Sequence, residues 1–209
     1  MSVLNKLACA QNRRDEVPNQ KLAQELVQNG DTSGIREIAE NLWNKDTDIQ
    51  SDCIKVIYEI GYLKPELIAA YTPDFLKLLK SRENCLVWGA MLALSTVAAL
   101  KADELFPHIG EIQHAMEKGS VITEDNGVGT LALIASTKEE YNQVIFPYLL
   151  NHLATCRPKS VPQHAEKTLI AVNAQNKEAF IQVLEKRLED LLGGQVSRVK
   201  KVIREAEKK

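Results

Sequence analysis

Apolar residues recur at every third or fourth position along most of the chain. This spacing gathers them on one face of an α-helix, and no segment alternates apolar and polar residues as a strand between hairpin turns would. The pattern predicts helices over residues 18–29, 33–44, 47–60, 64–70, 73–81, 83–99, 102–118, 121–136, 138–155, 161–174, 177–192 and 195–207. Helices of this length with short connections are typical of antiparallel helical hairpins.

Glycines mark some of the predicted helix ends and also occur inside helices. Those that follow an apolar run, as helix-ending glycines do, are Gly30, Gly61 and Gly119. Gly89, Gly127 and Gly129 instead lie within apolar helical segments. Each internal glycine destabilises a helix by about 1 kcal/mol relative to alanine. We therefore expect another backbone to approach closely there, and a ligand that needs the same clearance is the alternative.

Several sequence elements recur at a spacing near forty residues. The segment Leu105-Phe-Pro-His-Ile109 matches Ile145-Phe-Pro-Tyr-Leu149 at an offset of 40. The Leu-Ala-Leu triplets at 92–94 and 131–133 are offset by 39. A period of this length, with two helices in each unit, indicates a helical solenoid.

These repeats resemble HEAT and armadillo repeats over about residues 47–192. The first helix of a HEAT repeat is often bent by a proline, and Pro107 and Pro147 stand inside the first helices of their units. The Asp and Val-Arg ladder common in second helices is absent from the central repeats, and only 195–201 resembles it. The resemblance implies an all-α, right-handed α-α superhelix of about four or five HEAT-like hairpins. A globular bundle of the same helices is the alternative.

The two ends of this single domain, residues 1–209, are interpreted as caps. Residues 1–46 are predicted to form N-terminal capping helices and 193–209 a C-terminal capping helix. The last helix has an apolar stripe at helical spacing, made of Val199, Val202, Ile203 and Ala206. Its other side is basic, which suits the solvated outer face that a terminal repeat needs. Contact with a phosphate or an acidic partner is the alternative.

Composition and charge narrow the classes of function. The chain is 44% hydrophobic and 26% charged, as ordinary folded domains are, and only 5% aromatic, so the core must be mostly Leu, Ile, Val and Ala. Its net charge is −2, whereas proteins that bind phosphate backbones show a basic excess, so nucleic acid is not the expected partner. No apolar stretch approaches the ~20 residues that cross a bilayer. We therefore expect a cytoplasmic protein without a membrane partner.

The residues able to carry chemistry are sparse. The four cysteines form no CxxC pair and are expected to be free thiols in a reducing compartment: Cys9, Cys53, Cys85 and Cys156. The four histidines show neither HExxH nor metal-ligand spacing with a cysteine: His108, His114, His152 and His164. No GxSxG motif occurs, and Cys156 before Arg157 is interpreted as a helix end. We expect no metal, no cofactor and no catalytic residue.

One polar cluster, Glu124-Asp125-Asn126, opens a helix that then becomes apolar. Acidic side chains in a first helical turn interact favourably with the helix dipole, by about 0.3–1 kcal/mol each. The functional alternative is an acidic spot on the concave face, which second helices line in such repeats. The predicted binding residues on that face are Asn84, Trp88, Glu124, Asp125, Asn126 and His164. Trp88 is either a core residue or an exposed anchor for a partner.

These observations predict a non-catalytic scaffold that binds a protein or peptide on the concave surface of a solenoid. The resemblance also supplies two alternatives. One is a HEAT-like nucleic-acid-binding protein similar to the alkylpurine DNA glycosylases, against which the near-neutral charge and the few aromatic residues speak. The other is a small-molecule role like that of the HEAT-containing bilin lyases, which no particular residue supports.

Overall fold

A computed structural model describes residues 2–209, which form twelve α-helices and eight short 3₁₀ helices without any strand. The α-helices are α1 (Val17–Asn29), α2 (Thr32–Glu40), α3 (Thr47–Leu63), α4 (Thr72–Leu78), α5 (Asn84–Val97), α6 (Ala102–Leu105), α7 (Ile109–Lys118), α8 (Val121–Thr137), α9 (Glu139–Thr155), α10 (Val161–Thr168), α11 (Lys177–Arg187) and α12 (Gly194–Glu207). The 3₁₀ helices are η1 (Val3–Lys6), η2 (Cys9–Gln11), η3 (Asn41–Trp43), η4 (Pro65–Leu67), η5 (Ala69–Tyr71), η6 (Phe106–His108), η7 (Leu169–Ala171) and η8 (Leu188–Asp190).

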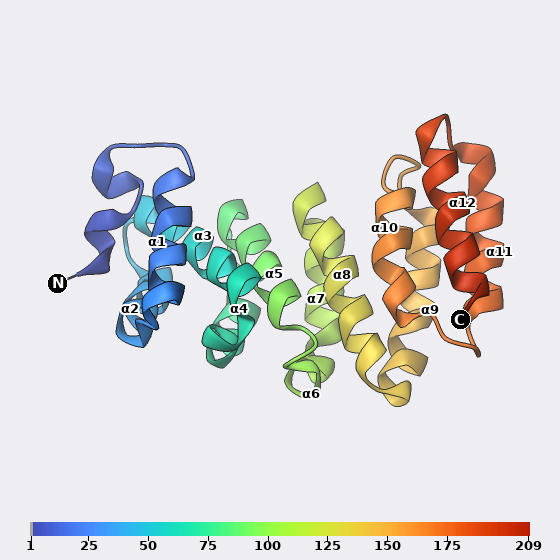
Figure 1. Ribbon diagram of the computed structural model, residues 1–209, viewed down its shortest axis with the longest axis horizontal. Helices are drawn as coiled ribbons and strands as arrows, with labels where there is room; N and C mark the ends of the chain where they lie inside the picture. Colours follow the sequence, from blue (N-terminus) through green and yellow to red (C-terminus); the bar gives the residue numbers. More distant parts are fainter. Residues whose placement is uncertain (1) are drawn as a thin grey trace.

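The helices form two layers that follow the chain from one end of the molecule to the other (Figure 1). The hairpins are α2–α3, α4–α5, α6/α7–α8, α9–α10 and α11–α12, and α1 packs against α3 at the N-terminal end. Each hairpin packs mainly against its sequence neighbours, which is the arrangement of a solenoid and not of a globular bundle. The prediction of an all-α superhelix of HEAT-like hairpins is confirmed. The assignment of the two ends as caps stays a prediction.

The second helices of the hairpins, α3, α5, α8, α10 and α12, form one layer. Their successive members pack along one another more extensively than the first helices, α2, α4, α7, α9 and α11, do. In a curved stack the helices on the inner side lie closer together. The second-helix layer is therefore the inner, concave side, as the resemblance to HEAT repeats implied.

The structure corrects one predicted helix and one predicted helix end. The predicted helix 64–70 is replaced by the two 3₁₀ helices η4 and η5. Gly30 ends α1 in the left-handed region, with φ of 60°, and Gly119 follows α7, as predicted. Gly61 instead lies inside α3, which continues to Leu63. A Cβ at Gly61 would lie 2.8 Å from Cδ1 of Ile68 and closer still to Thr96. This glycine gives room to neighbouring side chains and does not terminate the helix.

The two repeated prolines have different effects. At Pro107 the predicted helix 102–118 is divided into α6, η6 and α7. At Pro147 helix α9 continues without a break, because its buried positions 141, 145, 149 and 153 keep one face on the core through the proline. We predicted two continuous helices that are bent at their prolines. The first is divided at Pro107, whereas the second stays continuous through Pro147.

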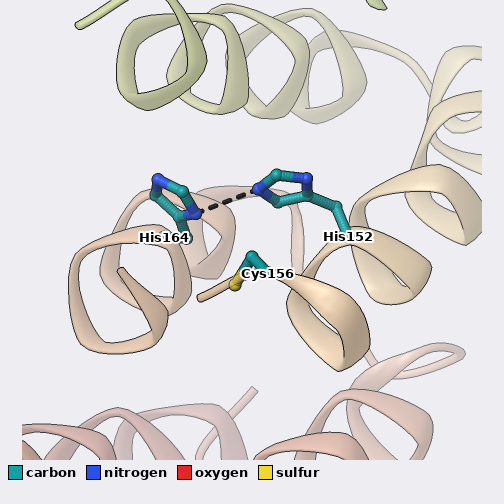
Figure 2. A group of neighbouring side chains, drawn as sticks. All are labelled: His152, Cys156 and His164. Atoms are coloured by element: carbon teal, nitrogen blue, oxygen red, sulfur yellow. Dashed lines mark hydrogen bonds between the residues drawn. The ribbon is translucent and has the colours of Figure 1, made fainter. Parts of the chain in front are cut away.

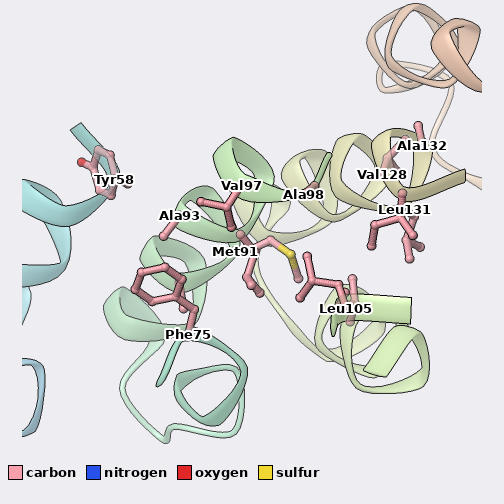
Figure 3. Close-up of a cluster of buried hydrophobic side chains, with 14 of the residues drawn as sticks. Tyr58, Phe75, Met91, Ala93, Val97, Ala98, Leu105, Val128, Leu131 and Ala132 are labelled. Carbon is pink, nitrogen blue, oxygen red and sulfur yellow. The ribbon is translucent and has the colours of Figure 1, made fainter. Parts of the chain in front are cut away.

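The core is continuous along the stack and consists mainly of aliphatic side chains. Figure 3 shows its middle part, where the side chain of Met91 on α5 points towards Leu105, with Leu131 of α8 beyond it. The predicted apolar stripe of α12 is buried at all four positions. Among residues 2–209 no helix combines the length and apolar character that a membrane span requires.

We expected another backbone to approach the glycines inside helices, and this prediction was wrong. Gly89 and Gly127 make room for side chains, and a Cβ at Gly129 would meet only Lys167, at 3.5 Å. A Cβ at Gly89 would lie 2.7 Å from Cγ1 of Ile54, and one at Gly127 would overlap the side chain of Met116. Gly89 thus allows close packing of α5 on the second helix α3, and Gly127 allows close packing of α8 on α7, the first helix of the same hairpin.

Candidate functional site

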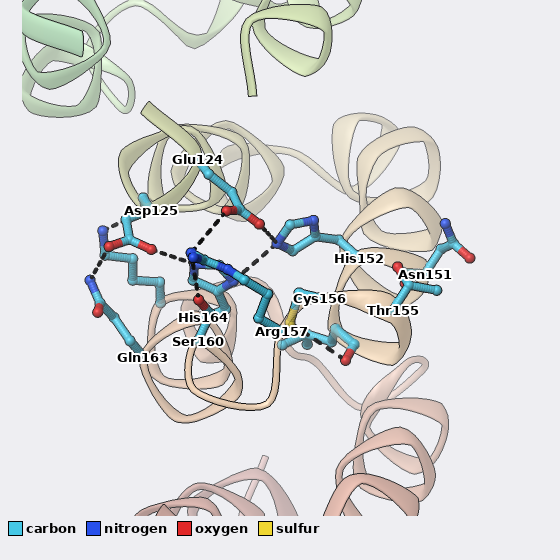
Figure 4. Close-up of polar contacts among 12 residues, drawn as sticks. Glu124, Asp125, Asn151, His152, Thr155, Cys156, Arg157, Ser160, Gln163 and His164 are labelled. Carbon is cyan, nitrogen blue, oxygen red and sulfur yellow. Dashed lines mark hydrogen bonds and ion pairs between the residues drawn. The ribbon is translucent and has the colours of Figure 1, made fainter. Parts of the chain in front are cut away.

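The first turns of α8 carry the polar cluster Glu124-Asp125-Asn126, whose side chains point towards α9 and α10 (Figure 4). Helix α8 begins after Ser120, whose Oγ accepts a hydrogen bond from the Thr123 amide at 3.4 Å. This cap fixes the orientation of the first turn and therefore the direction of the three polar side chains.

Asp125 begins a chain of hydrogen bonds through two imidazole rings. Its Oδ1 lies 2.7 Å from Nε2 of His164 on α10, and Nδ1 of His164 lies 3.0 Å from Nε2 of His152 on α9. The His164 side chain is completely buried. Because a carboxylate only accepts hydrogen bonds, Nε2 of His164 carries the hydrogen and donates the hydrogen bond to Asp125. Three successive helices are thus connected through one buried histidine.

Burial keeps the second imidazole neutral. It lowers the pKa of His152 to about 4, with a further lowering from the neighbouring His164 and an opposing contribution from Asp125. A neutral imidazole has one N–H and one nitrogen without a proton. In the neutral pair, Nε2 of His152 donates to Nδ1 of His164, and the lone pair of His152 lies on its Nδ1.

One neutral imidazole and two cations, Arg157 and Lys167, lie beside the acidic residues of this cluster. Glu124 lies 3.6 Å from Nε2 of His152 and 3.5 Å from Nη2 of Arg157. The ammonium group of Lys167 donates to the Asp125 carbonyl at 2.5 Å, and burial lowers the pKa of Lys167. The predicted acidic cluster is therefore paired with side chains of α9 and α10.

Cys156 lies beside the two histidines at the end of α9 (Figure 2). One ligand atom from each of His152, Cys156 and His164 can be chosen so that all lie within 4.8 Å of one another. Burial raises the pKa of the Cys156 thiol, and the charge of Arg187 opposes that rise. A cavity of about 390 Å³ reaches this place and is lined by Glu124, His152 and Cys156, among others. All four cysteines of the chain are free, as expected.

A second hollow lies on the inner side of the stack. It has a volume of about 330 Å³ and crosses three successive second helices, with Ser95 from α5, Gly129 and Leu133 from α8, and Ile170 after α10. We call it the inner groove. Asn126 and Lys167 also line it, so it borders the polar cluster.

Four of the six predicted binding residues come together: Glu124, Asp125, Asn126 and His164. The other two lie apart on α5. Asn84 is exposed and lines a separate pocket of about 620 Å³ between the α4–α5 connection and α7. Trp88 is half-buried against the core, with its ring 6.0 Å from that of Tyr58.

Four residues that complete the cluster were not among the predicted binding residues: His152, Cys156, Arg157 and Lys167. Cys156 before Arg157 was interpreted as a helix end, and it does end α9. One signal was present, because His152 and Cys156 are four residues apart and therefore share a helix face. The offset of 39 between Asp125 and His164 equals the repeat length and places them on adjacent second helices.

Comparison with known proteins places the fold. No protein family matches the chain, and no curated protein matches it. An engineered protein of known crystal structure superposes with a TM-score of 0.68 at 17% identity, over 100% of this chain and 98% of its own. The fold is an armadillo-like helical repeat.

Designed armadillo repeat proteins show the same similarity. One, solved in complex with the peptide (KR)4, has a TM-score of 0.68 at 17% identity and covers 90% of this chain and 85% of its own. Another, designed for modular peptide recognition, has a TM-score of 0.67 at 15% identity over 88% and 86% of the two chains. At this level of identity the similarity concerns the armadillo-like fold.

Proposed function

We propose that this armadillo-like repeat is a non-catalytic scaffold whose inner side binds an extended peptide segment of a partner protein. The observation that carries the proposal is the inner groove, which crosses α5, α8 and α10. A segment lying across these helices contacts corresponding positions of successive repeats. This is how a stacked array binds a long and narrow partner.

The side chains along the inner side suit such a partner. Leu133 and Ile170 give the inner groove apolar walls, and Ile170 is 49% exposed. Towards the N-terminus Trp88 and Tyr62 extend the surface with aromatic rings, each 6.0 Å from Tyr58. Aromatic side chains at a binding surface are frequent hot spots, since they bury a large area with little loss of conformational freedom.

Two further facts support a peptide over other partners. The similar designed armadillo proteins are described as peptide binders, one of them in complex with (KR)4. The inner groove carries both Glu166 and Lys167, and this mixed charge suits a peptide better than a uniformly anionic nucleic acid.

Selection from a displayed library of unstructured peptides tests the proposal, followed by measurement of Kd for the selected sequences. We expect Trp88→Ala to weaken binding by at least about tenfold, as loss of an aromatic hot spot does. The matched control is Trp43→Ala, because Trp43 lies on η3, away from the inner groove, and donates to Asp74. This control should leave Kd unchanged.

Two results would contradict the proposal. The first is a library that yields no peptide with a Kd below the millimolar range. The second is an equal loss of affinity in Trp88→Ala and Trp43→Ala, which would place the binding surface elsewhere. Thermal unfolding of both variants separates a change in affinity from a change in folding.

A further inference from the structure

We propose that His152, Cys156 and His164 form a binding site for a divalent transition-metal ion of the zinc type. We expected no metal site from the sequence, because no motif with known ligand spacing is present. The fold brings the three possible ligands together, because α10 packs alongside the end of α9. This site is separate from the inner groove and does not depend on peptide binding.

The positions of the ligand atoms fit one ion. Nε2 of His152 and Nδ1 of His164 lie 3.0 Å apart. Two imidazole nitrogens on a tetrahedral zinc ion, each ~2.0–2.1 Å from the metal, are separated by roughly 3.3 Å. The rings therefore need to separate by only a few tenths of an ångström. Cys156, one helical turn after His152, has a sulfur that lies within 4.8 Å of one nitrogen of each ring. In a tetrahedral site a sulfur and a nitrogen are roughly 3.5 Å apart, so the thiol approaches by up to about 1 Å on binding.

The surroundings of His164 are those of a metal ligand. Its Nε2 is held by Asp125 at 2.7 Å, which leaves Nδ1 directed at His152. Ligating histidines almost always donate their other N–H to a carboxylate or carbonyl group, which fixes the ring and increases its basicity. Asp125 is itself held by Gln163, at 3.3 Å from its Oδ2. Asp125 and Gln163 thus hold the fully buried imidazole of His164 in the orientation that a metal ligand needs.

An ion between the two rings replaces the hydrogen bond that joins them. The proton on Nε2 of His152 moves to Nδ1 of the same ring by exchange with solvent, so that both facing nitrogens, 3.0 Å apart, offer lone pairs to the metal. The Cys156 thiol must lose its proton on binding. Arg187 donates to the Cys156 carbonyl at 2.8 Å, so a positive charge lies close to the thiolate that forms. One proton is therefore released to solvent for each ion bound.

A fourth coordination position faces the cavity that is lined by Glu124, His152 and Cys156. Three protein ligands with one open position, filled by water or another group, are typical of accessible zinc sites. Glu124, at 3.6 Å from Nε2 of His152, borders this position. Two imidazoles and one thiolate favour zinc and its substitute cobalt over magnesium or calcium, which prefer oxygen ligands.

Titration of the chelator-treated, thiol-reduced protein with Co²⁺ tests the site, because a cobalt–thiolate bond gives a charge-transfer absorption band. We expect the band to saturate at one ion per chain and to be displaced by Zn²⁺. Cys156→Ser should abolish the band and His152→Gln should weaken binding by at least tenfold. Asp125→Asn, which changes only the support of His164, should weaken binding about 10–100-fold.

The matched controls are Cys85→Ser and His114→Gln, which alter the same residue types outside the cluster. Both should keep the cobalt band and its affinity. The proposal is overturned if the wild-type protein binds less than one Co²⁺ per chain at micromolar concentration. It is also overturned if Cys156→Ser keeps the band, since another cysteine then holds the metal. The wild-type titration decides the matter even where a variant fails to fold.

Discussion

At the scale of single residues, a few buried polar side chains join neighbouring helices by binding their backbones. Asn142 of α9 donates to the Ala171 carbonyl at 2.7 Å and accepts from Asn176 at 2.9 Å. Arg187 of α11 donates to the carbonyls of Leu153 and Cys156, at 2.6 and 2.8 Å. Helix ends leave such carbonyls without partners inside the helix, so each of these side chains satisfies a backbone group that would otherwise be unpaired.

Arg187→Met tests this role. The substitution keeps most of the apolar stem but leaves two buried carbonyl groups without donors, so we expect the free energy of unfolding to fall by about 2–4 kcal/mol. The control is Arg198→Met. Arg198 is more than half exposed and pairs with Glu166, so its loss should cost at most about 1 kcal/mol. Denaturant unfolding of both variants measures the difference. Equal losses would show that the two buried carbonyls contribute nothing particular to stability.

At the scale of helices, periodicity predicted the existence and order of nearly every element, because each helix buries one apolar face. One error is the predicted helix 64–70, which is two 3₁₀ helices, and others concern glycine and proline. Gly61 has the sequence signature of a helix end, yet its role is to give room to Ile68 and Thr96. Pro107 and Pro147 occur in matching segments, yet only the first interrupts a helix. These outcomes depend on contacts between helices, which a local pattern does not contain.

The glycines inside second helices lead to opposite expectations for one substitution. Gly89→Ala places a Cβ 2.7 Å from the buried Ile54, so overpacking should exceed the gain in helix propensity and destabilise the protein by about 1–2 kcal/mol. A Cβ added by Gly129→Ala would contact only Lys167, at an ordinary van der Waals distance of 3.5 Å. This substitution should therefore stabilise the protein by up to about 1 kcal/mol. Thermal and denaturant unfolding compare the two. A stabilising Gly89→Ala would mean that α3 and α5 are not closely packed at this point.

The candidate cluster was only half predictable for a similar reason. Glu124, Asp125, Asn126 and His164 were selected as polar residues on second helices, and the repeat length brought them together. His152 and Cys156 belong to a first helix, α9, and reach the cluster only because the end of α9 lies beside α10. Asn84 and Trp88 were selected by the same rule but lie one repeat earlier, on α5. The position of a residue within its repeat thus predicts which layer of helices it belongs to. Whether two such residues touch also depends on whether their repeats are adjacent.

At the scale of the whole molecule, the hairpins form a linear array with a continuous core. The chain ends lie at opposite ends of the stack, so no contact connects the first hairpin with the last (Figure 1). In such an array stability is approximately a sum of terms within repeats and between nearest neighbours. A defect should therefore act mainly on nearby hairpins, unlike a defect in a globular core.

Hydrogen exchange measured by mass spectrometry tests this locality with three core substitutions. Leu22→Ala in α1 removes a buried side chain at the N-terminal end, and Leu184→Ala in α11 does the same near the C-terminal end. Each change costs about 2–5 kcal/mol. We expect Leu22→Ala to lower amide protection at least about tenfold in α1 and α3 but to leave α11 and α12 unchanged, with the reverse for Leu184→Ala. Met91→Ala, in the middle of the stack, should lower protection towards both ends, because α5 contacts both α3 and α8. Uniform loss of protection from either terminal substitution would instead identify the array as one cooperative unit, in which coupling between neighbouring hairpins exceeds the stability of each hairpin.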